Sequence, residues 1–231
     1  MSRGARDLWI FAYGSLMWNP GFPFSVRQRA KLVGFRRALC VYSVLYRGTR
    51  NRPGLVLGLD RGGACEGIAY RIAADEAPAV LSYVRSRELI YGVYREAVVP
   101  VTLAESGSRE VLALTYIAER QHPSYAGDLG LAKETRVVRA ASGTMGPNMD
   151  YLFNTLDHLR ALAIDEPRLE RLAVMVGAVL SHEQEMPGRR ARTASLPSTL
   201  RHRLTPARAQ RADEKNRFGY RRVIYARTCA S

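Results

Sequence analysis

The chain has 231 residues, 47% of them hydrophobic and 24% charged, which excludes a protein that is disordered throughout and allows a packed core. The formal net charge of +14 suggests a nucleic-acid-binding protein, but residues 187–231 carry 12 Lys and Arg against 2 Asp and Glu, whereas residues 1–186 carry 23 against 19. We therefore predict a nearly balanced globular domain over residues 1–186 and a basic, disordered tail over residues 187–231, since such tails are usually solvated.

The cysteines and the N-terminal residues indicate a reducing compartment. Cys40, Cys65 and Cys229 are odd in number and form no C-x-x-C pair, which is typical of buried thiols rather than of a disulfide framework. There is no apolar run of 18 residues and no signal-peptide pattern, so we expect a soluble, cytoplasmic protein with no membrane partner. Tail segments such as Arg189-Arg190-Ala191-Arg192 lack the periodicity and aromatic interleaving of a stacking platform, so nucleic-acid binding is not expected.

The first 120 residues contain six apolar segments with the composition or the alternation of β-strands. In chain order they are residues 8–12, 31–42, 55–59, 68–72, 93–103 and 110–118. The turn residues at 60–63, which include two glycines, predict a hairpin between the third and fourth segments. The polar residues at 105–108 predict a second hairpin between the last two.

A helix is predicted between the two hairpins, over residues 75–88. Its apolar stripe has members at steps of four and three residues: Ala77, Leu81 and Val84. The next position on this stripe is Glu88, and a carboxylate that faces the core is unfavourable unless it is paired or neutralised. The alternative is that the helix frays before Glu88, which then pairs with Arg85 or Arg87 in solvent.

Two more helices are predicted after residue 147, each with an apolar stripe that indicates core packing. The first stripe contains Leu152, Leu156, Leu159 and Ala163, and the second contains Leu169, Leu172, Ala173, Val176 and Leu180. Strands with one inserted helix, followed by helices, predict an α+β fold in which a small mixed sheet or barrel carries helices outside it.

The turn Tyr13-Gly14-Ser15-Leu16 is the first candidate site, since it follows a short apolar strand. A glycine at this place lets successive backbone N–H groups point toward one anion. The alternative is a strand-exit turn whose Tyr13 and Leu16 enter the core. A carboxylate close to such a turn could move a proton on the bound group, so Glu88 is the candidate acid–base.

Several familiar catalytic patterns are missing from the sequence. It contains no dinucleotide-binding, P-loop, hydrolase-elbow or zinc-protease motif, and its four histidines are scattered, so we expect neither a cofactor nor a metal. Ser15 has no recognisable base partner and is interpreted as a hydrogen-bond donor. One carboxylate with an anion-binding turn suits a reaction in which the substrate supplies its own nucleophile, such as an intramolecular cyclisation.

Four segments together carry a family resemblance. They are YGSL at residues 13–16, VLYRGT and PGLVLGL at residues 44–59, RE and YGVYR at residues 87–95, and YAG at residues 125–127. This combination resembles the γ-glutamylcyclotransferase superfamily and, within it, the ChaC branch of glutathione-specific γ-glutamylcyclotransferases. The resemblance runs from about Trp9 to Leu180. Some relatives have two adjacent glycines where this chain has Gly92-Val93.

The resemblance implies a closed, mixed γ-glutamylcyclotransferase-like β-barrel with flanking helices, and cleavage of glutathione to 5-oxoproline and cysteinylglycine. It implies that Glu88 is the catalytic acid–base. The turn is implied to hold the γ-glutamyl moiety, and we extend binding roles to an arginine that would meet the glycyl carboxylate and to a tyrosine that would donate a hydrogen bond. The substrate-binding residues are then Tyr13, Gly14, Ser15, Leu16, Arg47 and Tyr125.

Other interpretations stay open. Arg47 is equally well explained as a charge at a strand edge, and Tyr125 as a loop tyrosine that packs on the barrel rim. The same cyclisation could act on other γ-glutamyl peptides or amines. A function of another class, an adaptor that binds nucleic acid or an anionic surface, would use the tail at residues 187–231.

Overall fold

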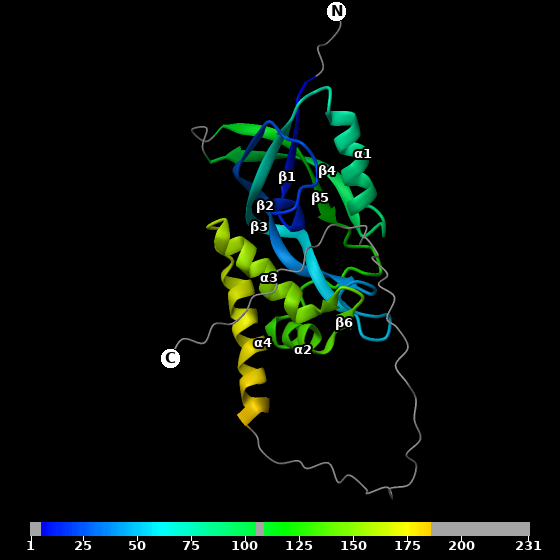
Figure 1. Cartoon of the computed structure of the whole chain (residues 1–231), viewed down its shortest axis with the longest axis vertical. Coiled ribbons are helices and arrows are strands. Elements are labelled where there is room, and N and C mark those ends of the chain that lie inside the picture. Colours follow the sequence, from blue (N-terminus) through cyan, green and yellow to red (C-terminus); the bar gives the residue numbers. More distant parts are fainter. Residues whose placement is uncertain (1–5, 105–108, 186–231) are drawn as a thin grey trace, which may run out of the picture. The chain divides into compact units, whose positions relative to one another are not determined.

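Five strands form a closed barrel in the order β1-β3-β2-β4-β5 (Figure 1). They are β1 (Leu8–Ala12), β2 (Val26–Ser43), β3 (Gly54–Ile72), β4 (Tyr94–Leu103) and β5 (Glu110–Ala118). β1 runs parallel to β5 where Ile10 pairs with Leu114, and the neighbours in the barrel order are antiparallel, so the predicted mixed barrel is confirmed. This computed structural model describes residues 6–104 and 109–185; the turn expected at 105–108 and the tail lie outside the described residues.

The hairpin expected around residues 60–63 is wrong. β3 continues through these residues as one strand of 19 residues, paired along its length with β2. Gly62 and Gly63 have φ of +97° and +72° and form a bulge opposite Gly34, whose φ is +89°. Glycines with positive φ serve a bulge as well as a turn, and the bulge bends the long ladder so that it can curl into a barrel. The second hairpin is confirmed, with β4 antiparallel to β5.

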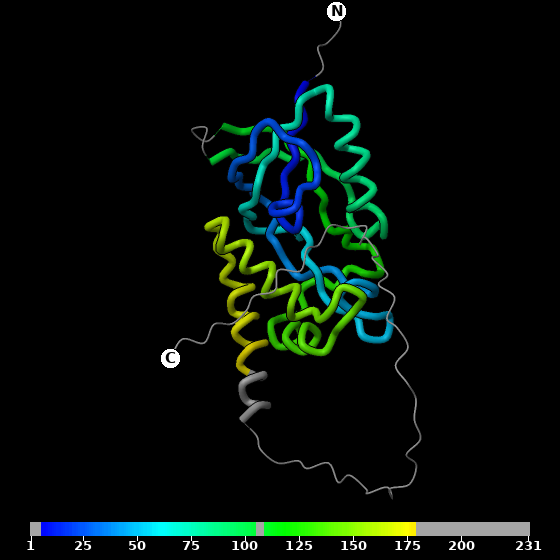
Figure 2. Tube along the Cα trace, in the orientation of Figure 1, coloured from blue at the N-terminus to red at the C-terminus, as the bar shows by residue number. Residues whose placement is uncertain are grey.

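The helices form two groups around the barrel (Figure 1). α1 (Ala77–Glu88) connects β3 to β4 and lies beside β4. α2 (Leu131–Ala140), α3 (Asn148–Ala161) and α4 (Pro167–Glu185) contact one another, and α2 and α3 contact β3. Figure 2 traces the chain through them, with the short β6 (Ser142–Gly143) and β7 (Gly146–Pro147) between α2 and α3. The sequence did not predict α2.

The apolar stripes of the helices are partly as expected. α3 buries Leu152, Leu156 and Leu159, but it ends at Ala161, and Ala163 follows with a φ of +51° instead of extending the stripe. α4 buries the first four members of its predicted stripe, and the side chain of the fifth lies outside the described residues. No helix in the described ranges is long and apolar enough to cross a membrane.

The buried face of α1 differs from the predicted one by part of a turn. Val80 and Val84 are the buried residues, whereas Ala77 and Leu81 are only half-buried. Steps of four from Val80 lead through Val84 to Glu88, so the helix still delivers this carboxylate to the barrel side.

Candidate active site

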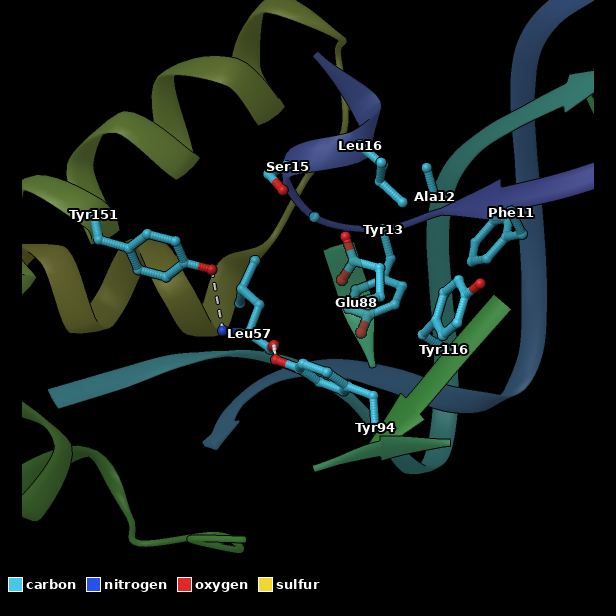
Figure 3. Close-up of a pocket in the computed structure, with 11 residues that line it drawn as sticks. Phe11, Ala12, Tyr13, Ser15, Leu16, Leu57, Glu88, Tyr94, Tyr116 and Tyr151 are labelled. Atoms are coloured by element: carbon cyan, nitrogen blue, oxygen red, sulfur yellow. Dashed lines mark hydrogen bonds between the residues drawn. The ribbon is translucent and has the colours of Figure 1, made fainter. Parts of the chain in front are cut away.

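A cavity of about 80 Å³ lies where the end of β1 meets the end of α1 (Figure 3). Its lining comes from β1, the turn after it, β3, α1, β4, β5 and α3: Phe11, Ala12, Tyr13, Gly14, Ser15, Leu16, Leu57, Glu88, Tyr94, Tyr116 and Tyr151. The glycine turn and the acidic residue singled out in the sequence therefore face one space. Within the described residues, no three His, Cys, Asp or Glu side chains are grouped so that they could hold a metal ion.

The turn after β1 becomes a single 3₁₀ turn, η1 (Ser15–Met17). Met17 N donates to Gly14 O at 2.9 Å, but within the described ranges the amides of Ser15 and Leu16 donate to no protein acceptor. The first N–H groups of a helical turn lack partners inside it, so these two amides are available to an anion. Gly14 has an ordinary negative φ of −129°, and a Cβ added to it would meet no atom within 4 Å. The glycine therefore leaves open space on the cavity side.

A buried arginine anchors the turn from the barrel side. Arg37 Nε on β2 donates to Tyr13 O at 2.6 Å, and its side chain has no exposed surface. Its guanidinium forms an ion pair with Glu166, just before α4, which satisfies a charge that would otherwise be very unfavourable in the core. Burial raises the pKa of the Glu166 carboxyl, and Arg37 opposes that rise. Tyr70 also donates to Met17 O, at 2.8 Å.

Glu88 is the last residue of α1, so the helix reaches it and the alternative of early fraying is wrong. Its side chain is 19% exposed, and its Oε1 lies 3.5 Å from Arg87 Nε. Arg85, the other expected partner, pairs with Glu96 instead. Burial raises the pKa of Glu88, and the positive charge of Arg87 partly opposes this. A carboxyl group with a raised pKa is a better acid–base near neutral pH than an exposed glutamate.

Four tyrosines complete the wall of the cavity (Figure 3). Tyr94 donates to Leu57 O at 2.6 Å, and Leu57 N donates to the hydroxyl of Tyr151 at 3.1 Å. Burial raises the pKa of Tyr13, Tyr94 and Tyr116, so these phenols stay protonated at neutral pH. The sequence assigned no site role to Tyr94, Tyr116 or Tyr151, because no local pattern shows which tyrosines on three separate elements face one another.

Tyr151 is held in place by its neighbour one helical turn earlier. Asn148 is fully buried at the start of α3; its Oδ1 accepts from Leu55 N at 2.6 Å and its Nδ2 donates to Leu55 O at 2.7 Å. The side-chain amide thus pairs with β3 as a neighbouring strand would. Together with the Tyr151–Leu57 bond, it fastens α3 to β3 at two successive points and fixes Tyr151 at the cavity.

Arg47 and Tyr125 do not line the cavity. Arg47 is half-buried, donates to Met145 O at 2.7 Å, and has its guanidinium carbon 5.6 Å from the centre of the Tyr151 ring. The hydroxyl of Tyr125 donates to Asp60 Oδ1 at 2.8 Å, within a cluster that includes Arg120. The structure therefore brings together five of the predicted site residues, Tyr13, Gly14, Ser15, Leu16 and Glu88, and leaves these two outside.

Comparisons with known proteins identify the family and the fold. Residues 8–179 match the sequence model of the ChaC-like protein family. The chain is 36% identical, over 75% of its length and 74% of the relative, to a glutathione-specific γ-glutamylcyclotransferase of Escherichia coli. It is 31% identical to glutathione-specific γ-glutamylcyclotransferase 1 of Homo sapiens, over 75% of this chain and 79% of that one. A crystal structure of a yeast γ-glutamylcyclotransferase specific to glutathione has the same fold, with a TM-score of 0.67, 22% identity, and coverage of 74% of this chain and 96% of that one.

Proposed function

The chain belongs to the ChaC-like family, and we propose that it is a glutathione-specific γ-glutamylcyclotransferase, which converts glutathione to 5-oxoproline and cysteinylglycine. The observation that carries this proposal is that Glu88 and the turn residues Ser15 and Leu16 line one cavity. We place the proposed activity in residues 1–186, because within the described ranges the lining runs from Phe11 to Tyr151. Cys40 and Cys65 are free, buried thiols, which supports the proposed cytoplasmic location.

The turn is proposed to bind the α-carboxylate of the γ-glutamyl group through the amides of Ser15 and Leu16. This contact bends the γ-glutamyl chain so that its α-amine faces its own γ-carbonyl carbon. A well-oriented intramolecular attack reaches effective molarities of about 10⁵–10⁸ M, equivalent to about 7–11 kcal/mol of the barrier. Holding the substrate in this bent form would therefore supply much of the catalysis.

Glu88 is proposed to move the protons. As a carboxylate it removes a proton from the α-ammonium, and the free amine attacks the γ-carbonyl carbon to form the ring C–N bond. The amide bond to the cysteinyl nitrogen then breaks, and Glu88 returns its proton to that leaving nitrogen. The ring nitrogen loses its second proton to solvent, and the released amine of cysteinylglycine takes up a proton from solvent to become an ammonium. The atoms of glutathione are divided between two products, and no water is consumed. The raised pKa of Glu88 suits both directions of transfer.

Arg47 and Tyr125 lie outside the cavity lining, and we propose that they contact the part of the substrate beyond the γ-glutamyl group. Arg47 lies over the Tyr151 ring, so it would meet a substrate that extends past Tyr151, as the glycyl end of a tripeptide does. Tyr125 would have to release Asp60 before it could donate to substrate. Both remain proposals that depend on where the cysteinylglycine half lies.

Incubation of the purified full chain with glutathione, followed by mass spectrometry for 5-oxoproline and cysteinylglycine, tests the proposal. We expect both products in equal amounts, and a loss of about 10²–10⁴-fold in kcat for Glu88→Gln while glutathione still binds. Parallel reactions with γ-glutamyl-alanine and γ-glutamyl-lysine test the alternative substrates. Turnover of those two without turnover of glutathione would replace the proposed substrate, and wild-type kcat in Glu88→Gln would remove Glu88 from the mechanism.

A further inference from the structure

Arg87 makes a set of contacts that the proposed reaction does not use. Its side chain is 20% exposed, and its guanidinium spans the gap between α1 and the turn after β1. Nη2 donates to Ser15 Oγ at 2.9 Å, Nη1 donates to Asn19 O at 2.9 Å and to the Tyr83 hydroxyl at 3.3 Å, and Nε lies 3.5 Å from Glu88 Oε1. One side chain thus touches both the turn and the acidic residue.

These contacts join two parts of the site that are 72 residues apart in the chain. The amides of Ser15 and Leu16 sit at the start of η1, and the carbonyl of Asn19 lies just after its end, so Arg87 holds the turn near both its ends. The planar guanidinium presents several donors in a fixed fork, whereas a lysine ammonium at the same place offers a single centre. A rigid guanidinium can therefore fix the distance between the turn and Glu88, in addition to placing a positive charge beside the carboxyl.

We propose that Arg87 is a positioning residue, which holds the Ser15–Asn19 turn at a fixed distance from the Glu88 carboxyl. The proposal rests on the proposed function, because that distance matters only if the turn holds a substrate that Glu88 deprotonates. Misplacement of a reacting group by about 1 Å can reduce rates about 100-fold, so such a clamp would act strongly on turnover.

Arg87 also has an electrostatic effect on Glu88. Among the described residues that line the cavity with Glu88, the titratable groups are tyrosines: Tyr13 after β1, Tyr94 on β4, Tyr116 on β5 and Tyr151 on α3. Tyrosines are neutral up to about pH 10, so they add no charge in the working range. Arg87 is the cation beside the carboxyl, and its removal should raise the pKa of Glu88 further.

Two variants separate position from charge. Arg87→Gln removes both, so we expect kcat/KM for glutathione to fall about 100-fold and the acidic limb of its pH profile to move to higher pH. Arg87→Lys keeps the charge but loses the fork, so kcat/KM should fall while the pH profile stays close to that of the wild type. Arg160→Gln is the matched control, because Arg160 is an exposed α3 arginine whose recorded partners, Asp157 and Glu170, lie outside the lining; its kinetics should not change.

A titration without substrate keeps this proposal separate from the proposed function. Carbon-13 NMR of labelled glutamate side chains, with Glu88→Gln to assign the signal, gives the pKa of Glu88 in the wild type and in Arg87→Gln. If the wild type turned over no glutathione, the proposed function would fail, and the titration would still decide whether Arg87 acts on Glu88. Unchanged kcat/KM in both variants would overturn the proposed positioning role, and an unchanged Glu88 pKa in Arg87→Gln would overturn the electrostatic effect of Arg87 on Glu88. Arg87→Lys supplies the kinetic test if Arg87→Gln does not fold.

Discussion

Replacing Asn148 by alanine should release the start of α3 from β3. The side-chain amide of Asn148 accepts from Leu55 N and donates to Leu55 O, and both residues have no exposed surface. Alanine can make neither bond. Two backbone groups of β3 would then be left unpaired in the core.

The loss of stability in Asn148→Ala can be worked out from these two unpaired backbone groups. A buried polar group left without a partner is destabilising by about 1–3 kcal/mol, so two such groups give about 2–6 kcal/mol. The better helix propensity of alanine offsets about 0.5 kcal/mol. We expect the free energy of unfolding to fall by about 3 kcal/mol, a large part of the roughly 5–15 kcal/mol typical of a folded domain.

Urea unfolding followed by tryptophan fluorescence measures this change. With an m-value of about 2 kcal/mol per M, the midpoint should fall by about 1.5 M. Asn154→Ala is the matched control, since Asn154 is an exposed asparagine of the same helix, and its midpoint should stay level or rise slightly. A midpoint for Asn148→Ala within 0.3 M of the wild type would refute the reasoning that Asn148 substitutes for a neighbouring strand.

Three further outcomes are expected. Gly14→Ala should fold normally, because its Cβ meets no atom within 4 Å, but should raise KM for glutathione about tenfold by filling the space beside the turn; an unchanged KM would place the substrate elsewhere. Glu166→Gln should lower the free energy of unfolding by about 3 kcal/mol, measured in urea, because it leaves the buried charge of Arg37 without its carboxylate. Glu170→Gln, whose side chain is 39% exposed, should change it by less than about 1 kcal/mol, and equal losses would contradict this. Glu88→Gln should be more stable than the wild type at neutral pH but not in acid, as urea unfolding across pH can measure.

The sequence predicted well those elements whose signal is local. β5 matches its predicted bounds, and β4 pairs with it in the antiparallel sense that the predicted hairpin requires. α2 was missed because its buried residues, Glu134, Thr135 and Val138, form no apolar stripe. Glu134 is buried because Arg168 of α4 pairs with it at 2.8 Å, and a contact between residues so far apart leaves no periodic pattern in the chain.

The same contrast holds for the candidate site: the residues with a local motif were predicted, and those brought together by the fold were not. The turn and Glu88 were found because each carries a motif, although the helix delivers Glu88 along Val80 and Val84, of which only Val84 belongs to the predicted stripe. The tyrosines that form the wall come from strands and a helix whose relative positions depend on the barrel register and on buried polar anchors such as Asn148. Tyrosines are common in protein cores, so the sequence alone does not distinguish these wall tyrosines from ordinary core residues.

The position of Glu88 links the proposed chemistry to stability. Burial raises the pKa of Glu88 above its ordinary value of 4.5, so the folded chain binds this proton more tightly than the unfolded chain. Between pH 4.5 and the raised folded pKa, the folded state holds more protons, and the free energy of unfolding therefore falls as pH rises, by about 1.36 kcal/mol for each unit of pKa elevation. Glutamine stays neutral, so Glu88→Gln lacks this fall: the two proteins should differ little below pH 4.5, and the variant should be the more stable one above the folded pKa. A stability difference that did not change with pH would mean that the carboxyl is as well solvated in the folded chain as in the unfolded one, and the same result would remove the reason for its suitability as an acid–base at neutral pH.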